Sequence, residues 1–202
     1  MKILKNYLFA AAVVSSSAFL SPIAMSDTSD KGFYLTAGIG TGLETDVDGS
    51  VDGTDFTAKA RTTFAGGLGL GYDFDNNWRV ETGVTRTTAN IDEVVVGGTT
   101  YNIDDNESAT GVSIAIEYDF ENDSKITPFI SGSYGITWVD GDSSTGYGVG
   151  FGLSTPTSDN MEFWGAVGLG FSQDDSETIS GSLVEVDGGT EWGFSTGLRI
   201  KL

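Results

Sequence analysis

The chain has 202 residues, which is enough for one domain of ordinary size. It contains 29 acidic and 10 basic residues but no histidine or cysteine, and its formal net charge is −19. This acidic excess argues against nucleic-acid binding, which requires basic patches. Without histidine or cysteine, catalytic triads, Cys–His pairs and histidine metal sites are excluded, so we expect no enzymatic activity and no cofactor.

Residues 1–26 predict a secretory signal peptide. Lys2 and Lys5 supply a charged start, an apolar stretch runs from Tyr7 to Leu20, and Ala24-Met25-Ser26 is a small-residue cleavage site. We expect the exported protein to begin at Asp27, with an uncleaved membrane anchor as the alternative. No later run of about 18 apolar residues exists, so we expect no other membrane-spanning helix.

The remaining chain alternates large apolar residues with small or polar ones in eight segments. Because successive side chains of a strand point to opposite faces, each segment predicts a strand with one apolar face. In the last segment the apolar residues are Trp192, Phe194, Leu198, Ile200 and Leu202. A membrane barrel can end in this way because its last strand pairs with its first. The segments are 33–43, 63–74, 78–85, 111–120, 130–138, 147–154, 161–171 and 192–202.

The connections between these segments alternate in length. Short turns are expected at 75–77, 121–125 and 156–160, and the other connections span 44–60, 90–108, 139–146 and 173–189. Short periplasmic turns and longer extracellular loops are typical of outer-membrane barrels. The sequence therefore predicts an all-β fold, an eight-stranded antiparallel up-and-down transmembrane barrel over residues 27–202. The residues around Gly97-Gly98 and Gly181-Ser182 could form ordered hairpins or flexible loops.

The chain resembles the small eight-stranded outer-membrane barrels of the OmpA-like and opacity-protein-like family over its whole exported length. The most specific part of this resemblance is the C-terminal pattern of Ser195, Gly197, Ile200 and Leu202. In the family, such a pattern is the signal that the barrel-assembly machinery reads, although the usual last residue is Phe. The resemblance implies an outer-membrane location, with the assembly machinery and periplasmic chaperones as partners.

Eight strands enclose an interior barely wide enough for its own side chains, which accounts for the 29 glycines. Buried charges persist only when they are paired, so we expect an Arg/Glu network that plugs the barrel or gates a thin water path. Three further charged residues, Asp73, Asp119 and Lys201, are expected nearer the periplasmic mouth. The charged residues expected in the lumen are Arg79, Glu81, Glu117, Glu162, Glu191 and Arg199.

The four longer connections are strongly acidic. In chain order they hold five, five, two and five acidic residues against a single base, Lys59. Divalent cations are candidate partners here, and the weak candidate ligands are Asp46, Asp48, Asp52 and Asp55. The EF-hand spacing fails in this segment, so a solvated acidic loop is the alternative.

Three functions remain open at this stage. The first is a structural or surface-interaction protein that presents acidic loops above a largely plugged polar lumen. The second is a narrow, cation-preferring channel, and the third is a soluble lipocalin-like carrier with its large apolar face turned inward. In the first two cases the surrounding partners are outer-membrane lipids and lipopolysaccharide.

Overall fold

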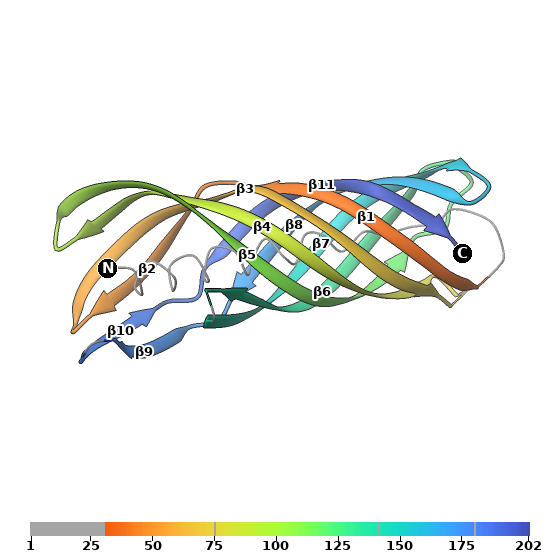
Figure 1. The fold of residues 1–202 in the computed structure, drawn as a ribbon. Helices are drawn as coiled ribbons and strands as arrows, with labels where there is room; N and C mark the ends of the chain where they lie inside the picture. The colour runs from red at the N-terminus through yellow and green to blue at the C-terminus, as the bar shows by residue number, and fades with distance from the viewer. Residues whose placement is uncertain (1–30, 75, 141, 180) are drawn as a thin grey trace.

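A computed structural model describes residues 31–202 except 75, 141 and 180, so the predicted signal peptide lies outside the described residues. The described chain consists almost entirely of antiparallel strands (Figure 1). Within it, no helix is long and apolar enough to cross a membrane. The strands are β1 Gly32–Gly42, β2 Thr45–Val51, β3 Thr54–Asp73, β4 Trp78–Val96, β5 Thr99–Asp119, β6 Thr127–Val139, β7 Asp142–Ser158, β8 Met161–Ser172, β9 Asp175–Ile179, β10 Ser182–Val186 and β11 Thr190–Lys201.

Eight of these strands close into a ring. The order around it is β1-β11-β8-β7-β6-β5-β4-β3, and β1 also pairs with β3. On each of its two sides, β1 makes nine antiparallel residue pairs, so the last strand is joined to the first and the ring has no free edge. The prediction of an eight-stranded antiparallel barrel is confirmed.

The outer wall of the ring carries the large apolar side chains. Leu68 is 70% exposed, Ile39 54% and Trp192 51%, while small, polar and charged residues turn inward. Such a wall matches the hydrocarbon layer of a membrane. A lipocalin-like carrier would need the opposite arrangement, with the large apolar face inside, so the carrier hypothesis does not fit.

An aromatic girdle surrounds the end of the barrel that has the short turns. Tyr72 packs edge-on against Phe33 and Phe74, with ring centroids 4.9 and 5.1 Å away. Tyr118 makes similar contacts with Trp78 and Phe120, at 5.0 and 5.3 Å. Amphipathic rings settle at the membrane–water interface, so this end marks the periplasmic boundary of the membrane.

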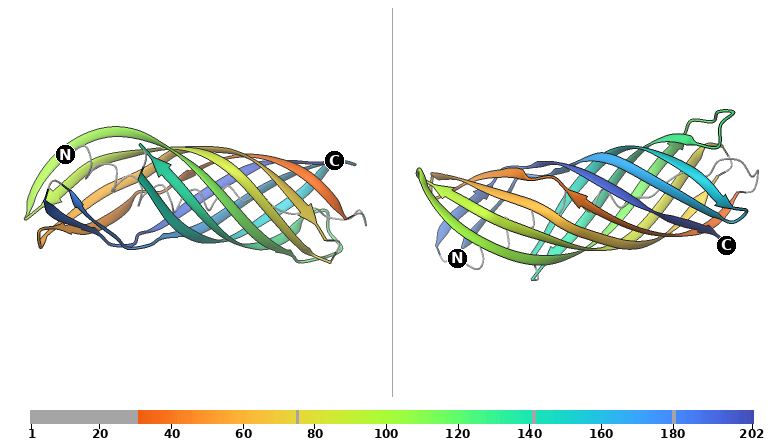
Figure 2. Two further views of the ribbon diagram at one scale, coloured as in Figure 1. Left: turned by 60° about the horizontal axis from the view of Figure 1, so that its bottom comes forward. Right: turned by 90° about the horizontal axis from the view of Figure 1, so that it is seen from above.

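At the opposite end, three hairpins continue the sheet beyond the ring (Figures 1 and 2). β2 pairs with the first part of β3, β10 pairs with β2, and β9 pairs with β10. β4 and β5 pair with each other as far as the turn at Gly97-Gly98. The positive φ angles of Asp52 (49°) and Gly53 (76°) are those of a two-residue type I′ turn, which fits the right-handed twist of the flanking strands.

The expected long loops are therefore mostly strands. The prediction of a loop was wrong for 44–60, which forms β2 and the start of β3. The connection 90–108, where a hairpin was one of two open readings, lies almost wholly in β4 and β5. Of the two readings left open, the ordered hairpin is the correct one at both Gly97-Gly98 and Gly181-Ser182. Each of these segments buries apolar side chains, among them Val47, Phe56 and Ile91, and this burial supplies the ordering free energy.

Two β-bulges set which side chains face inward in this extension. The pairing of β3 with β4 shifts register between Thr62 and Phe64. Before the shift the even-numbered residues of β3, such as Phe56, face inward, and after it the odd-numbered ones, such as Ala65, do. A second shift lies in β4 between Ile91 and Glu93. One extra residue exchanges the two faces of a strand, and these bulges turn apolar side chains inward above the ring.

Candidate functional site

The periplasmic half of the lumen contains a buried ion-pair network centred on Arg79 of β4. Its Nε lies 2.9 Å from Asp73 Oδ2 on β3, and its Nη2 lies 2.6 Å from Asp119 Oδ2 on β5. Its Nη1 lies 3.7 Å from Glu117 Oε1. The pairings Asp73↔Arg79 and Arg79↔Glu117 place carboxylates on both neighbouring strands directly beside the guanidinium.

A second buried cation, Arg199, lies on β11. Its Nη1 is 3.5 Å from Glu162 Oε1, which is directly opposite in the register of β8. Its guanidinium carbon lies 4.8 Å from the centroid of the Tyr34 ring on β1, a cation–π geometry. Arg199 and Glu162 are each only 1% exposed, so this pair is shielded from bulk solvent.

The other two predicted lumen residues lie elsewhere in the interior. Glu81 is buried on β4, two residues beyond Arg79 on the same inward face. Glu191 is buried towards the extracellular end of β11, where its Oε1 accepts a hydrogen bond from the Thr62 amide at 3.3 Å. All six predicted residues are thus inside the barrel, where Arg79 pairs with Glu117 and Arg199 pairs with Glu162.

Large aromatic side chains also fill the lumen, and the sequence reasoning did not assign them a role. Trp164 and Tyr34 are almost completely buried, and glycines provide the space for them. A Cβ atom on Gly71 would overlap the Tyr34 ring, and one on Gly197 would lie 2.6 Å from the Trp164 ring. The alternation pattern could have revealed these residues, because each stands among the inward-facing positions of its strand and next to glycines of adjacent strands.

Above this network, an apolar cluster occupies the interior of the extension. It joins residues from the outer parts of β2, β3, β4, β5 and β10 with Val139 at the end of β6. Ala89, Ala109 and Val139 face the lumen from three successive ring strands, so the cluster extends over the extracellular mouth of the barrel. Its buried members are Val47, Phe56, Ala58, Ala60, Ala89, Ile91, Val94, Ala109, Val139, Val184 and Val186.

The four weak candidate metal ligands lie in β2, in β3 and in the turn between them. Asp48 accepts a hydrogen bond from the Thr57 hydroxyl at 2.6 Å, and Asp52 accepts one from the Leu183 amide at 2.9 Å. Asp46 lies opposite Lys59 in the register, and Asp55 lies opposite Ser50. Among the residues that the structure describes, no group of three or more acidic side chains is placed to hold a metal ion.

Asp52 joins two extracellular turns. Its own amide donates to the Leu183 carbonyl at 2.9 Å, reciprocating the bond from the Leu183 amide to its carboxylate. Hydrogen bonds from the Ser182 hydroxyl and then from the Leu183 amide lower the pKa of Asp52 below its ordinary value. Beside this link, a polar cavity of about 540 Å³ is lined mainly by acidic residues, namely Asp55, Asp174, Asp175, Glu185 and Asp187, together with Ser50.

The residues of the predicted assembly signal lie on both faces of β11. Ser195 is buried on the lumen side, and Gly197 lies against Trp164. Ile200 and Leu202 are exposed on the outer wall. Their recognition by the assembly machinery stays a prediction.

Comparison with known proteins finds the same architecture in outer-membrane barrels. A family model described as "Outer membrane protein beta-barrel domain" matches residues 9–166. No curated protein matches the chain in sequence. The crystal structure of Neisserial surface protein A superposes with a TM-score of 0.55 at 18% identity, covering 86% of this chain and 99% of that one, a likeness that shows the fold alone.

Two more distant structures are also similar. The outer-membrane protease OmpT from Escherichia coli gives a TM-score of 0.47 at 8% identity, covering 89% of this chain and 99% of its own. The beta domain of the Bordetella autotransporter BrkA gives 0.35 at 14% identity, covering 86% and 100%. At these scores, neither likeness supports an argument about function.

Proposed function

The chain belongs to the outer membrane protein beta-barrel domain family and lies in the outer membrane, and on that premise we propose that it is a sealed barrel with a surface-interaction role. In this proposal the membrane ring is an anchor. The active surface is the ordered acidic sheet that β2, β9, β10 and the outer parts of β3, β4 and β5 form outside the membrane.

The main support for a sealed lumen is the apolar cluster at the extracellular mouth. Ala89, Ile91 and Val139 are each no more than 1% exposed, and they meet in the interior where an ion path would have to leave the barrel. An apolar constriction opposes the passage of hydrated ions, because an ion would lose its hydration without gaining a polar partner. The Arg79 and Arg199 networks fill the lumen below it.

The surface role is supported by the charge and order of the extension. Most of its acidic residues lie on paired strands or next to their ends, so binding of a partner would cost this surface little conformational freedom. The acidic cavity beside β9 and β10 offers several carboxylates at one place. The chemistry of such a surface favours cationic partners over anionic ones.

Planar-bilayer recording of the purified protein tests the seal. We expect no stable single-channel conductance from the wild type, and none from Arg79→Ala/Arg199→Ala while the apolar cluster is intact. The variant Ile91→Ser/Val139→Ser should introduce conductance, because it places hydroxyl groups and water in the constriction. A matched control is Tyr101→Ser, which changes an apolar residue of the same extension that is 55% exposed. Steady wild-type conductance would contradict the proposal.

A narrow cation-preferring channel is the second candidate, and one observation favours it. The buried lumen carboxylates outnumber the two buried guanidiniums, and Glu81, Glu117 and Glu162 each keep a buried Oε2 atom without a protein hydrogen bond. Water inside the lumen would satisfy such atoms. Cation-selective wild-type currents that fall on Glu81→Gln/Glu162→Gln would support this function over the sealed barrel.

Binding of a fluorescent decalysine peptide tests the surface role separately. Cells that display the protein should bind the peptide, and Asp55→Asn/Asp174→Asn/Asp187→Asn should bind several-fold less. A control set with Glu121→Gln, Asp123→Asn and Asp159→Asn removes equal charge from the periplasmic turns and should leave binding unchanged. Equal loss in both sets would contradict a specific surface. The absence of enzymatic activity stays a prediction from the lack of histidine and cysteine.

A further inference from the structure

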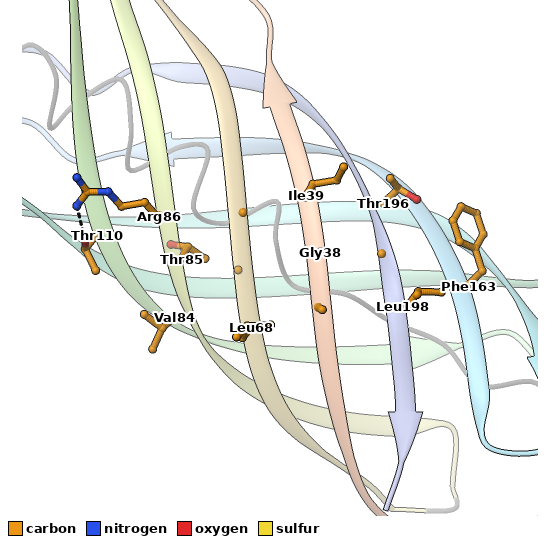
Figure 3. A pocket seen from close by; sticks show the side chains of 14 residues that line it. Gly38, Ile39, Leu68, Val84, Thr85, Arg86, Thr110, Phe163, Thr196 and Leu198 are labelled. Carbon is orange, nitrogen blue, oxygen red and sulfur yellow. Dashed lines mark hydrogen bonds between the residues drawn. The ribbon is translucent and has the colours of Figure 1, made fainter.

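The outer wall of the barrel contains a groove that faces the membrane. It has a volume of about 800 Å³ and extends from Thr110 on β5 across β4, β3, β1 and β11 to Phe163 on β8 (Figure 3). Its floor is made of small residues, among them Ala37 and Gly66, and its walls are Ile39, Leu68, Leu198 and Phe163. A depression with this lining suits a hydrocarbon chain, because the chain gains contacts that a smooth barrel wall does not offer.

A cation lies at the rim of this groove. Arg86 is exposed on the outer face of β4, and its Nη1 donates a hydrogen bond to Thr110 Oγ1 on β5 at 2.9 Å (Figure 3). On β4 the outward residues Trp78, Val80 and Val84 precede it from the periplasmic end. Arg86 is therefore the first charged residue beyond the outward apolar residues of β4, and its long side chain can extend to lipid head groups at the membrane surface.

Two more cations follow on the same wall. Arg61 and Lys59 lie further out on β3, next to β4, and Lys59 pairs with Glu93 at 3.3 Å. Among the described residues, the other bases are Lys31, Arg79, Lys125, Arg199 and Lys201, at the periplasmic end of the barrel. The extracellular half thus has its positive charge on one wall, directly above one groove, in a protein whose rim is otherwise acidic.

The spacing of the two arginines favours a head group with more than one phosphate. Arg61 pairs with Asn90, four residues beyond Arg86 on β4. At about 3.3 Å per residue, the two arginine positions lie about 13 Å apart along the strands. Guanidinium groups bind phosphates with paired, charge-assisted hydrogen bonds. A phospholipid with a single phosphate would engage only one of the two arginines.

We propose that this wall binds one lipopolysaccharide molecule through its lipid A part, with an acyl chain in the groove and its phosphates on Arg86 and Arg61. Lipid A combines several acyl chains with two phosphates, and it lies in the extracellular leaflet, to which the rim of the groove belongs. The acidic rim elsewhere would repel these phosphates, so the site fixes one orientation of the lipid against the barrel. The site is independent of whether the lumen is sealed.

Native mass spectrometry of the whole protein in detergent tests the site, with bisphosphorylated lipid A as the probe and monophosphoryl lipid A and phosphatidylglycerol as competitors. We expect bisphosphorylated lipid A to bind in one-to-one ratio, and Arg86→Gln to weaken this binding about tenfold, as loss of one charge-assisted contact implies. Arg86→Lys should keep most of the affinity. Lys125→Gln, which removes one positive charge from a periplasmic turn, should have no effect.

A groove variant separates specific binding from general lipid coating. Ala37→Phe adds a ring to the groove on the outer face, where Ala37 is exposed, and it should abolish the one-to-one adduct without changing the heat-modifiable gel mobility of the folded barrel. The proposal is overturned if Arg86→Gln and Lys125→Gln bind equally, if Ala37→Phe binds like the wild type, or if phosphatidylglycerol competes as well as lipid A does.

Discussion

Replacement of Arg79 by alanine is the sharpest test of the lumen network. The change removes the guanidinium and leaves Asp73, Glu117 and Asp119 together in a closed space, where Glu117 is 2% exposed and Asp119 is 3% exposed. Hydrogen bonds to charged groups are worth about 1.5–3 kcal/mol each, and breaking a buried ion pair from one side costs about 3–5 kcal/mol. Because the ion pairs of Arg79 with Asp73 and Asp119 are 2.9 Å or shorter, we expect a loss of about 4 kcal/mol.

Urea unfolding in detergent micelles, followed by tryptophan fluorescence, measures this loss. With a slope of about 3 kcal/mol per M, a loss of about 4 kcal/mol lowers the midpoint by about 1.3 M. Addition of Glu117→Gln and Asp119→Asn to Arg79→Ala removes the orphaned charges and should restore about half of the stability. A loss below about 1 kcal/mol would show that the carboxylates are solvated as in a surface pair, and the reasoning would fail.

Three further changes test other parts of the molecule. Gly71→Ala should destabilise the barrel by about 1–3 kcal/mol, since the new methyl group overlaps the Tyr34 ring. Gly32→Ala, which has open space around it, should leave the stability unchanged, and the midpoints of urea unfolding distinguish the two variants. Ile91→Ala should cost the apolar cluster about 2–5 kcal/mol and expose Lys59 and Arg61 to trypsin, while the ring keeps its heat-modifiable mobility. Asp52→Ala should speed hydrogen exchange of the Leu183 amide at neutral pH. Because the folded pKa of Asp52 is lowered, this protection is complete above the ordinary pKa of an aspartate, about 3.9, and is lost as the pH falls through the lowered value. A difference in exchange rate between variant and wild type that survives at the lowest pH would contradict the assignment.

The ring and its inward charges were predictable because a strand has a side-chain period of two. Arg199 and Glu162 both fall on the small-residue face of their segments, so their location in the lumen follows from parity alone. Their contact follows only from the register of β8 with β11, which no local pattern specifies. The contact of Arg79 with Asp73 was easier to predict than that of Arg199 with Glu162, because a short turn joins Asp73 and Arg79 and so limits their register.

The extracellular extension was only partly predictable from the same pattern, since ordered hairpins were open alternatives at Gly97-Gly98 and Gly181-Ser182 but not over 44–60. Acidic residues dominate its composition, and the bulges near Thr63 and Asp92 reverse the parity on which the strand predictions depend. Val47 and Val184 are more than a hundred residues apart in the chain, yet both belong to the apolar cluster. A contact of this kind depends on the pairing of β2 with β10, which exists only once the barrel has closed and brought both hairpins to one end.

The sequence by itself determined the class of the fold, the membrane-facing wall and the set of charges inside, because alternation and parity are local properties of a strand. The tertiary structure alone decided which of those charges pair, that an apolar cluster forms at the mouth of the barrel, and that Arg86, Arg61 and the groove share one wall. These features depend on strand register and on the two bulges, and register is a relation between distant segments that forms only when the sheet closes.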